Sequence, residues 1–413
     1  IALNYELFVA KRIISGKENK SSISSPIIKI AIAAISLGVI IMLIAIATGE
    51  GLREKIRSKM SGFKGHIQIT KYDANNSDVS VMPISKNQKF YPTFSNIKGI
   101  KNVQVYANQV GLIRTKTDFE GIVFKGVSTD YDWTFFKEYL IEGRIPDFNQ
   151  KRTRDVLLSK TIVNRLQLQL NDTINVTFFK NKASKLPSNR KLVITGIYNT
   201  GFLEFDKNIM IGDIRQVQRL NRWNENEVGG FEVILENFDE LQQKGTEIYK
   251  EIDATLDATT IASNYPGLFE WIELFDNNTW FIIIIMILVA GINMITALLV
   301  LILERIPMVG ILKAMGSSNW SIRKIFLYNA SYLIFVGLFW GNLIGLLLLF
   351  LQKYGRFITL DPATYYVSEV PISIDFLTIV FVNIGTLVLC FLMLIIPSVI
   401  ITKIQPSKSI RFA

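Results

Sequence analysis

Four long apolar runs dominate the hydrophobic pattern of the chain. The first covers residues 30–47 and is uncharged, and the other three, over 280–303, 325–351 and 376–402, contain no Asp, Glu, Lys or Arg. A helix of roughly 20 apolar residues crosses a hydrocarbon core about 30 Å thick. We therefore predict four transmembrane helices, the first at residues 27–48 and the others at the remaining three runs.

The first run has an alternative interpretation as a signal peptide. The letters AIA at positions 45–47 resemble a small-residue cleavage site. The apolar part of a signal peptide is usually about 7 to 15 residues long. This run is longer and a long segment precedes it, so we interpret it as a membrane-spanning helix.

The segment between the first two spans, residues 49–279, has a pattern of short alternating stretches. HIQITKY, GIVFKGV, TINVTFF and KLVITGIY are separated by Gly, Asn and Pro, which predicts strands. TIVNRLQL and FDELQQKGTEIYKEID have helical spacing. The fold class predicted is therefore an α-helical membrane protein with four transmembrane helices and a large α+β domain inserted between helices 1 and 2.

Both ends of the inserted domain carry apolar residues at helical intervals. These residues are Leu52, Ile56, Met60 and Phe63 at its start and Leu268, Trp271, Ile272 and Phe275 at its end. Spacings of three and four place side chains on one helix face. We predict a stalk helix at each end of the domain, continuing the adjacent transmembrane helix.

The distribution of charge indicates the orientation of the chain. Its formal net charge is +10, but residues 49–279 contain 31 Lys and Arg against 29 Asp and Glu, so the excess lies beside or between the apolar runs. That placement argues against a nucleic-acid-binding face, and basic residues in short flanks mark the cytoplasmic side of a membrane. The flanking basic residues are Lys11, Arg12, Lys17, Lys20, Arg305, Lys313, Arg323, Lys324, Lys403, Lys408 and Arg411.

We therefore predict that residues 1–26, 304–324 and 403–413 are cytoplasmic. Residues 49–279 and the short loop 352–375, with only two basic residues, are predicted to be periplasmic. Within 1–26, the stretch NYELFVAKRII places apolar residues beside Lys11 and Arg12, which predicts an amphipathic helix on the membrane surface. A solvated tail is the alternative for this segment.

Sites for catalysis are missing from the sequence. It contains no GxxxxGK[ST], GxGxxG, HExxH or GxSxG motif. Its single His, His66, and single Cys, Cys390, leave little material for a nucleophile and base pair or a zinc site. We interpret Cys390 as a packing residue and His66 as a surface or turn residue, and we predict that the chain is not an enzyme and holds no metal.

Two features inside the apolar runs concern contacts between helices. Gly337, Gly341 and Gly345 fall on one helical face, which predicts close approach to another helix, in this chain or another. The amides of Asn293, Asn342 and Asn383 lie in the second, third and fourth runs. An unpaired amide in hydrocarbon is costly, so we expect each to bond a neighbouring helix, with a substrate path as the alternative.

The stretch ERIPMVGILKAMGSSNWSIRKIF, between the second and third runs, predicts a short cytoplasmic helix. Pro307 suits a first helical turn, Gly316 suits a helix end, and Ser317 or Ser318 can cap the next helix. An apolar face is formed by Met308, Ile311, Leu312 and Met315. That face needs a cover, which could be the membrane surface, the N-terminal helix, or a groove in a separate subunit.

These stretches resemble the MacB/FtsX superfamily of ABC-transporter permeases, and within it most closely the lipoprotein-releasing LolC/LolE type. The resemblance is carried by the stretch just described, by AISLGVIIMLIAIATGEGLREKI and by IQPSKSIRFA. In the inserted domain EGRIPDF, VLLSKTIVNRLQLQLNDTINVTFF and ITGIYNTGFLEFDKNIMI also resemble it.

The resemblance implies a dimeric inner-membrane permease, with an identical or homologous second permease subunit and two copies of a separate ATPase that binds ATP and Mg²⁺. No cofactor is expected in this chain itself. The short cytoplasmic helix would be the coupling helix seated in the ATPase groove. Its implied coupling residues are Arg305, Pro307, Met308, Ile311, Leu312, Lys313 and Met315. Pro307 and Met308 replace charged residues of many relatives, so the apolar anchors are expected to matter more.

The resemblance also implies a lipoprotein substrate that is extracted from the inner membrane and passed to a periplasmic carrier. A carrier-binding hook would include Lys182, Lys185, Leu186, Pro187 and Arg190, with a solvated hairpin tip as the alternative. Acyl chains of the substrate would contact Met42, Ile46, Phe269, Trp271 and Trp280. Two other functions within the superfamily remain as alternatives, a MacB-like exporter of small molecules or peptides and an FtsX-like signalling protein that acts on a cell-wall hydrolase.

Overall fold

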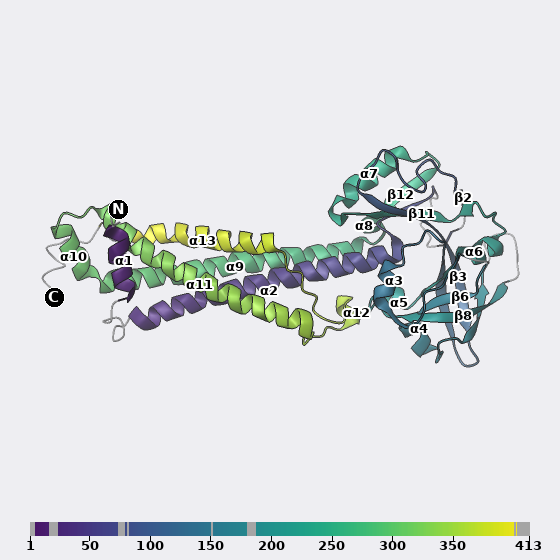
Figure 1. Cartoon of the computed structure of the whole chain (residues 1–413), viewed down its shortest axis with the longest axis horizontal. Coiled ribbons are helices and arrows are strands. Elements are labelled where there is room, and N and C mark those ends of the chain that lie inside the picture. Colours follow the sequence, from purple (N-terminus) through teal and green to yellow (C-terminus); the bar gives the residue numbers. More distant parts are fainter. Residues whose placement is uncertain are drawn as a thin grey trace. The chain divides into compact units, whose positions relative to one another are not determined.

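The computed structural model describes residues 5–15, 24–72, 79–80, 82–149, 152–179, 187–399 and 402. The chain divides into two compact units, and Figure 1 labels many of their elements. The helical bundle comprises residues 1–52, 272–358 and 370–413. The sheet domain comprises residues 53–271 and 359–369, so it includes one end of each of two long helices and a short loop from late in the chain.

The bundle is built on long apolar helices. Its helices, in the part of the chain that the structure describes, are α1 (Tyr5–Ser15), α2 (Ser24–Lys64), α9 (Pro266–Glu304), α10 (Ile306–Ala314), α11 (Asn319–Gly355) and α13 (Phe376–Ser398). Among these residues, four segments have the length and composition to cross a membrane, over Ile28–Lys64, Pro266–Glu304, Asn319–Gly355 and Phe376–Ile395. Helices α2 and α9 run without a break through both an apolar run and the adjoining stretch predicted as a stalk.

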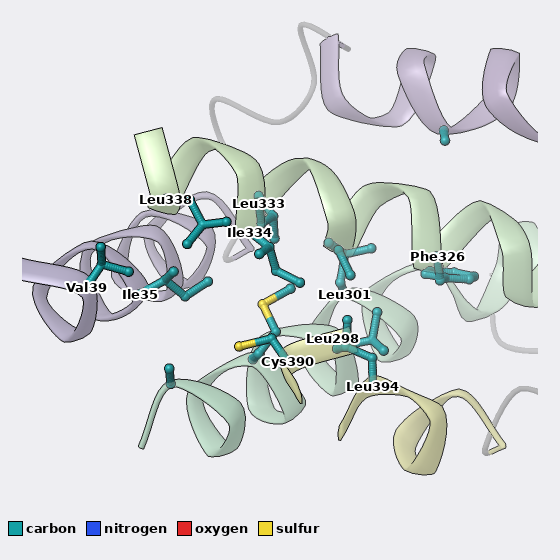
Figure 2. Close-up of a cluster of buried hydrophobic side chains, with 14 of the residues drawn as sticks. Ile35, Val39, Leu298, Leu301, Phe326, Leu333, Ile334, Leu338, Cys390 and Leu394 are labelled. Atoms are coloured by element: carbon teal, nitrogen blue, oxygen red, sulfur yellow. The ribbon is translucent and has the colours of Figure 1, made fainter. Parts of the chain in front are cut away.

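The core of the bundle is aliphatic. Figure 2 shows side chains from α2, α9, α11 and α13 packed together, with Ile35, Leu298, Ile334 and Leu394 among them. Cys390 lies in the same cluster with no exposed surface, so the prediction that it is a packing residue is confirmed.

The glycine series of α11 packs against α2 of the same chain. A Cβ atom on Gly337 would lie 2.7 Å from the Ile35 side chain, and one on Gly341 would lie 2.8 Å from Val39 Cβ. Ser36 Oγ also donates to the Gly337 carbonyl over 2.9 Å. Because lipid gives helices no hydrophobic reason to associate, such close packing and interhelical hydrogen bonds have to hold them together. The prediction of close helix approach is confirmed, and the structure adds that the partner helix is α2.

Two of the three asparagines predicted to bond across helices form a pair. Asn342 Nδ2 donates to Asn383 Oδ1 over 2.6 Å, and Asn383 Nδ2 returns a bond of 2.9 Å to Asn342 Oδ1. This pair joins α11 to α13, as predicted. Asn293 differs, because among the described residues its half-buried side chain makes no hydrogen bond to a neighbouring helix, so the expectation for Asn293 is not met.

Among its described residues, the sheet domain is organised around one mixed sheet of ten strands in the order β12-β1-β11-β3-β4-β9-β6-β8-β5, with β7 paired to β3 and β8. Two neighbouring pairs, β4 with β9 and β6 with β8, are parallel, and the other pairs are antiparallel. The strands of this sheet are β1 (Ile67–Lys71), β3 (Ile100–Arg114), β4 (Phe119–Val127), β5 (Leu140–Gly143), β6 (Asp155–Ser159), β7 (Thr173–Phe178), β8 (Ser188–Tyr198), β9 (Ile209–Asp213), β11 (Gly230–Leu235) and β12 (Leu256–Thr260). A separate ladder joins β2 (Ile84–Ser85) to β10 (Glu227–Val228).

Short helices connect these strands. They are α3 (Thr134–Tyr139), α4 (Lys160–Arg165), α5 (Leu203–Asp206), α6 (Ile214–Asn221), α7 (Leu241–Glu251), α8 (Ile261–Asn264) and α12 (Pro362–Tyr365), with a 3₁₀ turn η2 at Phe238–Glu240. The four stretches predicted as strands correspond to β1, β4, β7 and β8, and the two helical windows contain α4 and α7, so these predictions are confirmed.

The end of α2 is fixed inside the sheet domain by a buried ion pair. Lys125 Nζ lies 2.7 Å from Glu232 Oε1, and the two side chains are 3% and 1% exposed. Lys125 Nζ also donates to the Phe63 carbonyl over 2.6 Å, and Gln104 Nε2 donates to Glu232 Oε2 over 2.9 Å. The carbonyls of a last helical turn have no partner within the helix. The ammonium therefore caps α2 and links it to β4 and β11.

The turn after α2 is also buried. Gly65 has φ +71°, and a Cβ there would lie 2.8 Å from Glu232 Cβ, so this turn requires glycine. His66 Nδ1 accepts a hydrogen bond of 3.3 Å from the Leu235 amide. Burial lowers the pKa of His66 to about 4, which keeps the ring neutral. The prediction that His66 is a turn residue is correct, but its alternative as a surface residue is wrong.

The glycine contact between α11 and α2 can be tested with one added methyl group. Gly341→Ala should lower the thermal unfolding midpoint of the purified chain, because its Cβ has to displace Val39 or the Ser36 carbonyl, at 3.0 Å. Such overpacking typically costs about 1–3 kcal/mol. Gly385→Ala in α13 is the matched control, since a Cβ there meets nothing within 4 Å. Equal midpoints for the two variants would contradict the proposed packing.

The buried ion pair predicts an asymmetric response to substitution. Lys125→Met should lower the free energy of unfolding of the sheet domain by about 3–5 kcal/mol, because Glu232 is left buried without a counter-ion. Lys125→Met combined with Glu232→Gln should recover part of that loss. The control is Glu138→Gln, whose partner Lys55 is 45% exposed and whose removal should cost less than about 1 kcal/mol. Urea unfolding midpoints measure all three, and a Lys125→Met value no larger than the control would contradict the capping role.

Candidate functional site

The predicted coupling helix is α10, a helix of nine residues with defined ends. Pro307 lies in its first turn, as predicted from the sequence. Gly316 has φ +89°, and the Ser317 amide donates back to the Leu312 carbonyl over 3.0 Å, which closes the helix. Ser318, one of the two predicted caps, accepts the Ser321 amide over 3.2 Å and starts α11.

The apolar residues of α10 divide between two faces. Val309 and Leu312, three residues apart, are buried in the core of the bundle, at 0% and 9% exposure, and Met308 packs against that core. Ile311 and Met315 are 53% and 78% exposed. The prediction that Leu312 belongs to the uncovered face is therefore wrong. Each residue of a helix turns by about 100°, so Leu312 follows Val309 toward the bundle while Ile311 and Met315 point elsewhere.

The predicted N-terminal helix does not provide the missing cover. Helix α1 packs on the start of α11, where Ser321 Oγ donates to Glu6 Oε1 over 2.9 Å and Lys324 Nζ lies 3.9 Å from the same oxygen. Ala10, at 3% exposure, belongs to the bundle core. With α1 in this position Ile311 and Met315 are still exposed, so one of the open alternatives for their cover is removed.

The charged residues at the two ends of α10 are placed differently. Arg305 is the residue directly before the helix, and its carbonyl accepts the Val309 amide over 3.0 Å. Lys313, in the last turn, donates to the Thr402 carbonyl over 3.4 Å. Lys313 therefore contacts the segment after α13, and Arg305 takes part in the first turn of α10 through its backbone.

The predicted hook lies in a connection between paired strands. Strands β7 and β8 pair antiparallel from Thr173 with Val193 to Phe178 with Ser188. Lys182, Lys185 and Leu186 lie outside the described residues, whereas Pro187 and Arg190 are described. Burial, followed by repulsion from Arg219 and Arg152, lowers the pKa of Arg190, and its buried Nε has no hydrogen-bond partner among the described residues. Positive charge therefore gathers at the base of this hairpin.

The five candidate lipid contacts belong to different surroundings. In the bundle, Met42 is fully buried, Ile46 is partly buried and Trp280 is 65% exposed. In the sheet domain, the Phe269 ring stacks on Phe238 with centroids 6.0 Å apart, and Trp271 makes an edge contact with Tyr366. Met42, Phe269 and Trp271 therefore serve internal packing in this chain, and Trp280 is the most exposed of the five.

The loop between α11 and α13 makes a contact that the sequence does not indicate. Residues 359–369 of the predicted short loop belong to the sheet domain. There Tyr366 meets Lys59, Phe202 and Trp271. An aromatic residue in a short loop carries no sequence signal of its own, although Tyr365 and Tyr366 stand next to each other in the sequence.

The described residues do not form a recognisable catalytic site. They contain no group of three His, Cys, Asp or Glu side chains that could hold a metal. The most perturbed carboxyl, Asp206, is buried, which raises its pKa to about 6. Both of its oxygens accept bonds from Thr200, through the amide at 3.1 Å and Oγ1 at 2.7 Å, so the carboxyl organises a loop.

Protein-family models match both parts of the chain. The MacB-like periplasmic core domain matches residues 30–248, and the FtsX-like permease C-terminal model matches residues 280–406. A solved structure of the periplasmic region of MacB from Actinobacillus actinomycetemcomitans is 14% identical, with a TM-score of 0.36, and the match covers 52% of this chain and 97% of that one.

Curated relatives extend over nearly the full length. The lipoprotein-releasing system transmembrane protein LolC of Neisseria meningitidis serogroup B is 21% identical over 98% of this chain and 99% of its own. LolC of Buchnera aphidicola subsp. Schizaphis graminum is 22% identical over 92% of both chains. LolE of Haemophilus influenzae is 18% identical over 98% of this chain and 99% of its own.

The MacB-like model alone covers more than half of the 413 residues, and the FtsX-like model covers most of the remainder. The first match includes most of α2 and most of the sheet domain, and the second includes most of α9 and all of α10, α11 and α13. The chain therefore belongs to the family of ABC-transporter permeases with a MacB-like periplasmic core domain and an FtsX-like C-terminal region.

Proposed function

We propose that this permease subunit releases lipoproteins from the inner membrane and passes them to a periplasmic carrier. The observation that carries the proposal is the match, over 92% or more of both chains, to proteins named for lipoprotein release. The two-part architecture supports it, since apolar helices and a large sheet domain on the same chain suit a substrate with a lipid anchor and a folded body.

In this proposal α2, α9, α11 and α13 each cross the membrane, and the sheet domain is inserted between the first two crossings. The basic flanks place α1, α10 and the C-terminal segment in the cytoplasm. The sheet domain and the loop after α11 then lie in the periplasm. The chain supplies no catalysis of its own. ATP and Mg²⁺ are bound by a separate ATPase, in two copies, beside a second permease subunit.

Helix α10 is the proposed contact with the ATPase. Its exposed pair, Ile311 and Met315, is apolar and lies four residues apart on one helix face, which is the spacing of anchors that insert into a groove. Its other face is part of the bundle core. Force on the exposed pair is therefore passed to the bundle through Val309 and Leu312.

Charge on the exposed pair tests the coupling role. Ile311→Asp and Met315→Asp should each weaken binding of the ATPase at least about tenfold, which corresponds to about 1.4 kcal/mol, because a carboxylate has to be desolvated in an apolar groove. Co-purification of the ATPase and its rate of ATP hydrolysis in the complex measure the effect. Ile311→Leu and Met315→Leu are the matched controls and should bind normally. Undiminished capture by both Asp variants would refute the role.

Lipoprotein release itself is tested by depletion of the protein followed by membrane fractionation. Lipoproteins destined for the outer membrane should accumulate in the inner membrane, and re-expression of the intact chain should reverse this. A Met315→Asp chain should not reverse it. Normal delivery after depletion would overturn the proposal and favour an exporter or a signalling protein of the same family.

The lipid-contact hypothesis is best examined at Trp280. A photo-crosslinking residue at position 280 should capture acylated lipoprotein more strongly than one at Phe335 in α11, which is 60% exposed and serves as the matched control. The expected ratio of captured substrate is well above one, and equal capture would show that both positions face ordinary lipid.

A further inference from the structure

Tyr366, in the loop between α11 and α13, contacts three separate parts of the sheet domain. Its ring centroid lies 5.2 Å from that of Phe202, in the turn before α5. It lies 5.5 Å from the Trp271 ring on α9, at an interplanar angle of 88°. Its carbonyl accepts a hydrogen bond of 3.1 Å from Lys59 Nζ on α2. One residue thus joins the two stalk segments and the body of the domain.

The backbone of the loop is shaped to present this residue. Thr359 and Glu369 form a bridge, and the Leu360 amide donates to the Ser368 carbonyl over 3.0 Å, so the loop closes on itself. Asp361 caps α12 by accepting the Ala363 amide over 3.1 Å. Tyr366 follows with φ +59°, the left-handed conformation that ends α12. The loop therefore holds its tyrosine in one position.

The hydrogen bond to Tyr366 has a further consequence for Lys59. This lysine is 4% exposed, and burial lowers its pKa to about 8. The charged groups near it are Asp206 of α5, Glu138 of α3, Glu369 of the loop and Lys55 of α2, and its ammonium lies 5.8 Å from the Tyr139 ring of α3. Among the described residues, the Tyr366 carbonyl accepts its one hydrogen bond. A buried ammonium requires such a partner, so the loop supplies the hydrogen-bond acceptor that Lys59 of α2 needs.

The order of elements along the chain connects this contact to α10 by two routes. Helix α10 lies between α9 and α11 in the sequence. A displacement of α10 can therefore travel along α9 to Trp271 and along α11 to the loop that carries Tyr366. The two covalent paths meet again where the Tyr366 and Trp271 rings touch.

We propose that Tyr366 is a clasp that fixes the spacing of the α2 and α9 stalk segments and makes them move together with the loop after α11. Its contacts are non-covalent, two ring contacts and one hydrogen bond from an ammonium, so the clasp can open. It rests on the contacts of Lys59, Phe202 and Trp271 alone and does not require the substrate to be a lipoprotein.

A distance measurement on the full chain in nanodiscs tests the clasp. Nitroxide labels are placed at Ser58 on α2 and Glu270 on α9, both exposed, after Cys390→Ala removes the single native thiol. The parent should give one narrow distance distribution. Tyr366→Ala should lose the narrow peak, whereas Tyr366→Phe should retain it because the ring contacts persist.

Two further variants keep the test decisive. Tyr365→Ala is the matched control, since Tyr365 is the neighbouring aromatic residue and the described contacts include no ring partner for it, and it should behave as the parent. Lys59→Met leaves every ring in place and should broaden the distribution by removing the hydrogen bond. If Tyr366→Ala does not fold, the distance distribution of Lys59→Met alone tests the proposal. A parent-like distribution in both Tyr366→Ala and Lys59→Met would overturn the proposal, whatever the substrate of the transporter is.

Discussion

The structure depends on the buried ion pair that caps the C-terminal end of helix α2. Helix α2 leaves the apolar bundle and finishes inside the sheet domain, where the carbonyls of its last turn lie away from water. Lys125 supplies the missing donor at the Phe63 carbonyl, and Glu232 neutralises the charge that this donor brings. Removing either member would leave a buried charge without compensation. Lys125 thereby ties the last turn of α2 to β4 and β11, two strands in the middle of the sheet.

In the bundle, α2 is held by close packing against α11. Lipid removes the hydrophobic drive for helix association, and α2 and α11 approach closely because three glycines leave room for Ile35, Val39 and Leu43. Helix α2 thus packs in the bundle through close backbone approach at glycines. In the sheet domain, a charged side chain caps its last turn. A long helix that is held firmly at both ends can transmit displacement along its axis, which suits a protein whose energy source is on another subunit.

Much of this architecture could be predicted from the sequence because it depends on periodicity. The apolar runs, the stalk continuations, the strands with clear alternation and the short helix between Pro307 and Gly316 all follow from local patterns. The burial of Leu312 could not be predicted, because on a short helix between two long ones the apolar residues have two possible neighbours. The role of Tyr366 and the ion pair of Lys125 with Glu232 were equally hidden, since residues 107 positions apart meet only through the sheet. The composition of a sequence gives the number of charged residues, but it does not show which of them form ion pairs.

The reciprocal amide pair of Asn342 and Asn383 sets the register of α11 against α13. Both bonds are satisfied in one relative position. A slide by one helical turn, about 5.4 Å, would leave each Oδ1 without its donor, although each Nδ2 also donates to a carbonyl of its own helix. The pair therefore favours one position of α11 along α13. Because the loop that carries Tyr366 connects these two helices, the same two bonds also fix how far apart along the helix axis the loop begins and ends.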